Sequence, residues 1–206
     1  MGSTPEATHS RLILASASTA RAAMLRDAGI EFVVEPAAID EAAIKSKYRQ
    51  AGRDALACAM ALAEAKARGV ARRHPEALVI GADQILVAAA EWFDKPADLA
   101  EAAAQLRRLR GRLHVLATAA CAYQAEDCLW QASASPELTM RCFGEGFLAD
   151  YIAAEGPALH GSVGAYRLEG RGVQLFSRID GDHFAILGLP LIELLGFLRQ
   201  RGLLTE

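Results

Sequence analysis

The sequence predicts a mixed α/β fold in which helices flank a mixed β-sheet. Short apolar runs rich in β-branched residues alternate with segments of helical spacing, as expected for strands and helices of one domain. The alternation is irregular and includes long hairpin-like strands, which favours a mixed sheet over a regular doubly wound one. With 206 residues, 52% of them hydrophobic and 23% charged, the chain can bury a large core but is too charged for a membrane bundle.

Composition also narrows the expected partners and location. The formal net charge of -3 argues against a nucleic-acid partner, and no apolar run is long enough for a membrane span. We expect residues 1–11 to form a flexible N-terminal tail without a signal-peptide core, and residues 12–206 to form a single domain. Four cysteines without a CxxC pair indicate buried free thiols in a reducing cytoplasm.

The first predicted strand, Leu12 to Leu14, runs into a serine-rich turn. Ser18 or Thr19 can cap a following helix that ends at Gly29, and residues 30–34 are expected to form the second strand. A turn of this kind offers backbone N–H groups, hydroxyls and Arg21 to an anion. Serine caps are equally common without a ligand, so both interpretations stay open at this point.

Two adjacent acids, Asp40 and Glu41, follow in a predicted loop. Such acids are usually only solvated, but near a phosphate one of them could hold a divalent cation. Residues 53–68 have the alanine-rich spacing of a long helix that ends at Gly69. Lys66 lies near its C-terminal end, where a surface lysine would also complement the helix dipole.

The stretch from Leu78 to Pro96 organises the chain. Residues 78–80 predict a buried strand, and Gly81 with Ala82 has so little bulk that another backbone or a ligand could approach closely. Asp83 is then expected to emerge at the edge of the sheet, before a strand resumes at residues 85–87. Lys95 can return a cation beside this carboxylate, which suits metal-assisted phosphate chemistry. The alternative is that Asp83 only caps a turn and Lys95 is solvated.

The second half of the chain continues the mixed pattern. The predicted elements are a helix that Asp98 caps and Gly111 ends, strands at 115–123 and 129–142, a helix at 147–153, a glycine-rich passage at 156–172, strands at 173–177 and 179–187, and a last helix from Pro190 to Gly202.

Taken together, these landmarks resemble the Maf family of nucleoside triphosphate pyrophosphatases. The resemblance covers nearly the whole chain from Leu12 to Leu203, and the order and spacing of its short motifs make it specific. The matching pieces are Leu-Ile-Leu-Ala-Ser-Ala-Ser with Arg21, Ile-Asp-Glu41, Leu-Ala-Glu-Ala-Lys66, Val-Ile-Gly-Ala-Asp83, Lys95-Pro96, Leu-Arg-Gly-Arg-Leu-His114, Gly-Ala-Tyr166 with Gly170, and Ile-Asp-Gly-Asp182 with Gly-Leu-Pro190.

The resemblance implies a Maf/ITPase-like fold, with a curved mixed sheet in two lobes around a cleft, and commonly a homodimer. It implies hydrolysis of nucleoside triphosphates to the monophosphate and pyrophosphate with Mg²⁺ or Mn²⁺. Asp83 would be the catalytic carboxylate, as a base or only as a metal ligand, with Glu41 as the second acid at the metal. The implied phosphate-binding residues are Ser16, Ser18, Arg21, Lys66 and Lys95.

Two positions depart from the family pattern. Ala20 stands where an arginine is usual, and Ser162 where a lysine is usual. The loss of two cations should weaken triphosphate binding unless Arg167 or Arg171 compensates. A catalytically weak nucleotide-binding regulator of cell division is therefore the alternative function, although retention of the other site residues favours an enzyme.

Gln84 and Glu169 occupy the two positions that vary between substrate branches of the family. The branch that acts on methylated guanine nucleotides has Gln and Glu there, whereas the pyrimidine branch has Thr and Gln. A carboxylate can accept from N1–H and N2–H₂ of guanine, but it repels the acceptors of uracil. The resemblance thus implies a guanine-type triphosphate, unless Glu169 is merely a solvated turn residue.

Overall fold

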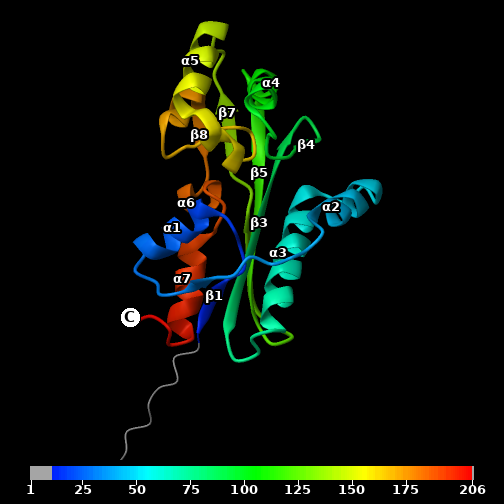
Figure 1. The fold of residues 1–206 in the computed structure, drawn as a ribbon, viewed down its shortest axis with the longest axis vertical. Helices are drawn as coiled ribbons and strands as arrows, with labels where there is room; N and C mark the ends of the chain where they lie inside the picture. The colour runs from blue at the N-terminus through cyan, green and yellow to red at the C-terminus, as the bar shows by residue number, and fades with distance from the viewer. Residues whose placement is uncertain (1–10, 206) are drawn as a thin grey trace, which may run out of the picture.

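The computed structural model describes residues 11–205, and every strand within that range belongs to one open mixed sheet (Figure 1). Of the expected tail, residues 1–10 lie outside this description. The strand order is β2-β1-β3-β5-β7-β8, with β4 paired to β3 and β6 paired to β5. The strands are β1 (Leu12–Leu14), β2 (Val33–Val34), β3 (Leu78–Ala88), β4 (Glu91–Phe93), β5 (Leu113–Gln124), β6 (Asp127–Ala134), β7 (Glu137–Met140) and β8 (Phe176–Asp180).

Helices cover both faces of this sheet. In Figure 1, α3 lies along one face, and α1 and α7 lie on the other. None of the helices within residues 11–205 combines the length and the apolar character that a bilayer crossing requires. The helices are α1 (Thr19–Asp27), α2 (Glu41–Gln50), α3 (Ala55–Ala71), α4 (Leu99–Leu109), α5 (Glu145–Glu155), α6 (His183–Ile186) and α7 (Leu191–Gln200), with 3₁₀ helices η1 (Gly156–Gly161) and η2 (Arg171–Leu175).

The long strand β3 has a gap along one of its edges. It pairs in parallel with β1 only as far as Ile80, and antiparallel with β4 only from Leu86 onward. Between these points, residues 81–85 are paired on the other side alone, with β5. Asp83 and Gln84 lie in this gap. Side chains from both faces of the sheet can therefore reach a ligand that enters at this edge.

Gly81 allows α3 to pack closely against β3. A Cβ atom at this position would lie 2.1 Å from the carbonyl oxygen of Ala63 in α3. The prediction that small residues here permit close approach is confirmed, and the approaching group is the helix backbone. The consequence for the site is that Lys66, one turn further along α3, reaches Asp83.

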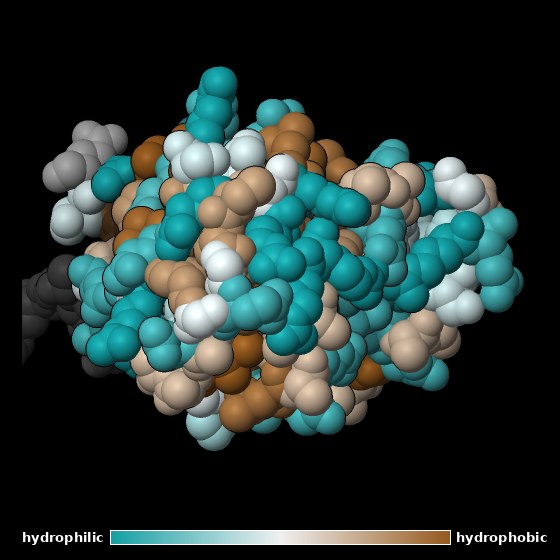
Figure 2. Space-filling model, turned by 90° about the horizontal axis from the view of Figure 1, so that it is seen from above, coloured by the Kyte–Doolittle hydropathy of each residue, from teal (hydrophilic) through white to brown (hydrophobic). Residues whose placement is uncertain are grey.

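The upper end of the molecule in Figure 1 has a separate core. Buried residues of β5, β7, α4 and α5 pack there with the glycine-rich passage, including Leu106, Leu138 and Tyr166. Seen from this end, the surface is largely hydrophilic and its hydrophobic residues form separate patches (Figure 2). The glycine-rich passage thus forms part of a packed core and not only of turns.

Most predicted elements are confirmed, but several predictions were wrong in detail. The long helix was expected to end at Gly69, but α3 continues to Ala71. The strand at 30–34 is only β2, and β3 is continuous, so Asp83 lies within a strand and not after its end. The strand at 129–142 is divided into β6 and β7 near Pro136, whose ring cannot donate to a ladder. The strands at 173–177 and 179–187 are replaced by η2, β8 and α6.

Another error concerns α2. Asp40 and Glu41 were expected in a loop, but Asp40 caps a helix by accepting from the N–H of Ala43 at 2.9 Å, and Glu41 opens it. Ile44 and Tyr48, four residues apart, pack this helix against the α3 side of the core. Glu41 is therefore held at a helix start and not on a free loop.

Candidate active site

A cavity of about 410 Å³ lies at the gap in the edge of β3. It brings together eight of the nine predicted site residues, from the loop after β1 and from α1, α2, α3, β3 and the segment after β4. The exception is Glu169. The residues that line the cavity are Ser16, Ala17, Ser18, Arg21, Glu41, Lys45, Lys66, Asp83, Gln84, Asp94, Lys95, Gly161 and Val163.

Lys66 lies between the two acids of the site. Its ammonium is 2.5 Å from Asp83 Oδ1 and 2.8 Å from Glu41 Oε1. The Lys66 and Asp83 side chains are only 10% and 9% exposed, whereas Glu41 is 45% exposed. Burial acts to raise the pKa of Glu41, but the charges of Lys66, Lys45 and Lys95 outweigh it and the pKa is lowered. Glu41 therefore stays ionised at neutral pH.

Arg21 is fixed by segments far apart in the chain. Its Nε donates to the carbonyl of Gly188 at 2.7 Å, and its Nη1 to Ser16 Oγ at 3.2 Å. Ser18 caps α1 by accepting from the N–H of Arg21, at 3.3 Å. Burial lowers the pKa of Arg21, while the nearby carboxylates of Asp83 and Glu41 oppose this. The guanidinium is thus held rigidly at the cavity wall.

Lys95 has no carboxylate partner within 4.0 Å among residues 11–205. Desolvation and then the charge of Arg21 lower the pKa of Lys95, although Glu41 and Asp83 act in the opposite direction. The cavity lining holds four cationic side chains and three carboxylates. It therefore has an excess of positive charge, with Lys95 available to an anion.

Gln84 is oriented by β5 and α6. Its Nε2 lies 2.8 Å from Thr118 Oγ1, 3.0 Å from the carbonyl oxygen of Ala185 and 3.1 Å from that of Ile186. Thr118, which the sequence did not single out, also donates to Ala185 O at 2.9 Å. Because protein acceptors occupy the amide nitrogen, Oε1 is the polar atom that Gln84 can offer to a ligand.

Glu169 lies on the surface of the glycine-rich passage. Its carboxylate is 3.6 Å from the Nε of Arg167, and its side chain is 40% exposed. Arg167 also pairs with Glu155, at 3.6 Å. Neither Arg167 nor Arg171 is among the lining residues of the cavity.

Two charged lining residues, Lys45 and Asp94, were missed by the sequence analysis. Their ion pair is 2.6 Å long. Asp40 as a cap and the spacing of Ile44 and Tyr48 could have identified α2. That helix would have placed Lys45 one turn after Glu41, on the same face. No local pattern indicates Asp94 as its partner.

The carboxylate oxygens of the cavity can be compared with the ligands that a divalent cation needs. Among residues 11–205, no three or more His, Cys, Asp or Glu side chains form a group that could hold a metal. Asp83 Oδ1 and Glu41 Oε1 both contact the Lys66 ammonium, so a cation would bind the second oxygen of each carboxylate. Mg²⁺ is commonly bound by one or two carboxylates plus substrate phosphates. The pair fits such a cation, provided that the substrate completes the coordination.

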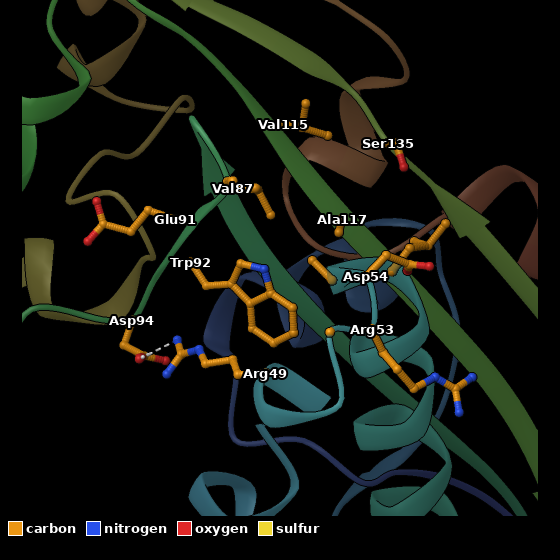
Figure 3. Close-up of a pocket in the computed structure, with 14 residues that line it drawn as sticks. Arg49, Arg53, Asp54, Val87, Glu91, Trp92, Asp94, Val115, Ala117 and Ser135 are labelled. Atoms are coloured by element: carbon orange, nitrogen blue, oxygen red, sulfur yellow. Dashed lines mark hydrogen bonds and ion pairs between the residues drawn. The ribbon is translucent and has the colours of Figure 1, made fainter. Parts of the chain in front are cut away.

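A larger cavity, of about 980 Å³, lies on the other side of Asp94. Figure 3 shows Trp92 pointing into it and Arg49 paired with Asp94 at its rim, at 3.3 Å. Most of the remaining lining is apolar, including Val87, Val115 and Ala117. This second cavity lacks the Asp83 carboxylate and the cations around it, so the smaller cavity is the candidate active site.

Comparison with known proteins agrees with this geometry. A nucleoside triphosphate pyrophosphatase of Granulibacter bethesdensis is 52% identical over 195 residues, covering 95% of this chain and 99% of the relative. One of Paramagnetospirillum magneticum is 50% identical over 190 residues, covering 92% and 98%. A 7-methyl-GTP pyrophosphatase of Rhizobium meliloti is 45% identical over 191 residues, covering 93% and 96%.

The family match is equally extensive. The sequence model described as "Maf-like protein" matches residues 11–201, a range that contains every residue of the cavity lining. The resemblance seen in the motifs is therefore confirmed, and the chain belongs to the Maf family.

Proposed function

We propose that this protein hydrolyses nucleoside triphosphates to the nucleoside monophosphate and pyrophosphate, with a divalent cation such as Mg²⁺ or Mn²⁺. The observation that carries the proposal is the convergence of Asp83, Lys66, Lys95 and Arg21 on one cavity. The names of relatives that align with this chain over almost their whole length support the same activity.

Cleavage at the α-phosphorus needs an activated water and neutralisation of the leaving pyrophosphate. A cation held by Asp83 and Glu41 would supply Lewis-acid polarisation of the phosphate. Asp83 acts on the attacking water, as its base or as a metal ligand, and Lys66 orients that carboxylate through their 2.5 Å contact. Arg21, Lys95 and the serines at the start of α1 bind the phosphates, where preorganised donors stabilise developing charge.

The test is a screen of canonical and modified triphosphates with Mg²⁺ or Mn²⁺ that measures both pyrophosphate and monophosphate. We expect Asp83→Asn to lower turnover by about a hundredfold or more in protein that circular dichroism shows to be folded at the assay temperature, because a base or metal ligand is lost. Asp127→Asn, on the exposed end of β6, is the matched control. Near-wild-type turnover by folded Asp83→Asn would contradict the assignment.

A guanine-type base, including 7-methylguanine, is the substrate class that we propose. Gln84 offers an acceptor to a ligand, and guanine presents two adjacent donors, N1–H and N2–H₂, where uracil presents one N–H between two carbonyls. The relative from Rhizobium meliloti, named 7-methyl-GTP pyrophosphatase, supports this choice. We expect higher kcat/KM for 7-methyl-GTP or GTP than for UTP and dTTP, and a smaller preference in Glu169→Gln. Faster hydrolysis of UTP or dTTP than of every guanine nucleotide would exclude it.

We also propose that the protein acts in the cytoplasm and as a homodimer. Its four cysteines are free thiols, as expected in a reducing compartment, although only Cys58 and Cys121 are buried as predicted and Cys128 and Cys142 are exposed. The family resemblance supports the dimer, and light scattering after size-exclusion chromatography tests it. A cell-division regulator without turnover is the weaker alternative, because the aligned relatives are named as pyrophosphatases.

A further inference from the structure

Lys45 is a cation of the cavity that neither the motif pattern nor the proposed mechanism uses. It follows Glu41 by one turn of α2, so both side chains lie on the same helix face. The Lys45 side chain is only 17% exposed and lines the cavity, whereas Lys47 on the same helix is exposed. Its ammonium contacts Asp94 Oδ1 at 2.6 Å.

Asp94 can release Lys45 without being left unpaired. Arg49 contacts its other carboxylate oxygen at 3.3 Å, from the side of the larger cavity (Figure 3). The Asp94 side chain is 52% exposed, and exposed ion pairs stabilise little. A charge-assisted bond to a phosphate oxygen is stronger than such a pair. It is therefore favourable for the Lys45 ammonium to leave Asp94 and to bind a phosphate oxygen instead.

The other cations of the cavity cannot move as easily. Lys66 is held between two carboxylates, and Arg21 already donates to Gly188 and Ser16. Lys95, like Arg21, has no carboxylate within 4.0 Å in the described range. A triphosphate brings several negative charges to this site. Beyond Arg21 and Lys95, Lys45 is a further cation that can reach the phosphates, whereas Ala20 and Ser162 supply none.

We propose that Lys45 is a substrate-binding residue that leaves Asp94 and binds a non-bridging phosphate oxygen when the triphosphate enters. The inference rests on the proposed function. A purely structural role is the competing explanation, in which the Lys45–Asp94 pair only fastens α2 to the segment that carries Lys95. The two explanations predict opposite effects of removing the Asp94 charge.

The experiment compares KM and kcat for the best triphosphate among four variants. Lys45→Met should raise KM roughly 10- to 100-fold, as loss of a bond to a charged group implies, and Lys45→Arg should restore most of the affinity. Asp94→Asn should lower KM, because Lys45 is released. Lys47→Met should match wild type. Calorimetric binding of inorganic tripolyphosphate should weaken in Lys45→Met by a similar factor, which provides a readout without turnover.

Two results would overturn the proposal. One is wild-type KM and tripolyphosphate affinity in Lys45→Met. The other is an equal rise in KM for Lys45→Met and Asp94→Asn, which would show that the pair only positions α2. Failure of the proposed function is distinguishable from both, because wild-type protein would then release no pyrophosphate from any triphosphate.

Discussion

Two clusters of buried polar side chains differ in their charge: one is ionic and the other is neutral. Lys66 and Asp83 form an ion pair, with Glu41 as a second acid, and this charged cluster borders the cavity. In the upper core, His114 Nε2 lies 2.9 Å from the hydroxyl of Tyr166, and Phe176 packs against both rings. Burial lowers the pKa of His114 to about 4, so this cluster is neutral at neutral pH.

The difference separates chemistry from packing. Desolvation of a buried ion pair is costly, and loss of one partner strongly destabilises the protein. At a cavity, however, the charges of the pair can act on a ligand. A neutral hydrogen-bonded pair inside a core contributes only to stability. The charged cluster should therefore control activity, and the neutral cluster should control the pH dependence of folding. Three substitutions test this division.

The largest effect is expected from Gly81→Ala, which should disturb the charged cluster by forcing the backbones of α3 and β3 apart. The new Cβ would lie 2.1 Å from the carbonyl oxygen of Ala63, and a backbone oxygen cannot rotate away. Overpacking of this kind destabilises by about 1–3 kcal/mol, and we expect the upper end of that range. Activity should fall with stability, because separation of α3 from β3 moves Lys66 away from Asp83.

Gly69→Ala is the matched control in the same helix. No atom lies within 4 Å of its added Cβ, so it should be neutral or stabilise α3 by about 0.5–1 kcal/mol. Urea unfolding and initial rates measure both variants. Equal stabilities for the two would show that close packing at Gly81 is not required.

The second prediction concerns pH and His114. Its folded pKa, about 4, is below the value of 6.5 expected for the unfolded chain. Between these values the unfolded state binds more protons, so stability is fully present above pH 6.5 and falls as the pH falls. From pH 6.5 to 5 the loss should be about 2 kcal/mol.

His114→Gln should flatten this part of the stability curve, while turnover at pH 7 stays near wild type. The exposed His183 provides the control substitution, His183→Gln, which should keep the wild-type slope. Chemical denaturation at several pH values measures both. A wild-type slope in His114→Gln would assign the acid sensitivity to other groups.

Local sequence patterns predicted much of this molecule, including the helix caps at Ser18 and Asp98. The Asp98 carboxylate accepts from the N–H of Glu101 at 2.7 Å. The local patterns failed where one residue type has two common uses. Asp40 was interpreted as a solvated acid and is a helix cap. Asp182 caps α6 by accepting from Ala185 at 2.7 Å, inside a segment whose apolar run predicted a strand.

The site itself depends on contacts that sequence spacing does not encode. The family motifs indicated which residues belong to the cavity, but not which groups hold them. Arg21 is anchored to Gly188, 167 residues away, and Gln84 to Ala185, 101 residues away. The Lys45–Asp94 pair joins α2 to the segment after β4, 49 residues apart. Such pairs follow from the packing of whole elements on the sheet.

The smallest effect is expected at Thr118, which lies between the two clusters on β5. Thr118→Val keeps the shape but removes the hydroxyl that accepts from Gln84 and donates to Ala185. Gln84 Nε2 still has Ala185 O at 3.0 Å, so no buried carbonyl is left without a donor. We therefore expect a stability loss of about 1 kcal/mol, the net value of one hydrogen bond. A less firmly held Gln84 should raise KM severalfold with little change in kcat. Thr139→Val on β7 is the control. A large fall in kcat for Thr118→Val would contradict the division, because it would extend the catalytic role beyond the charged cluster.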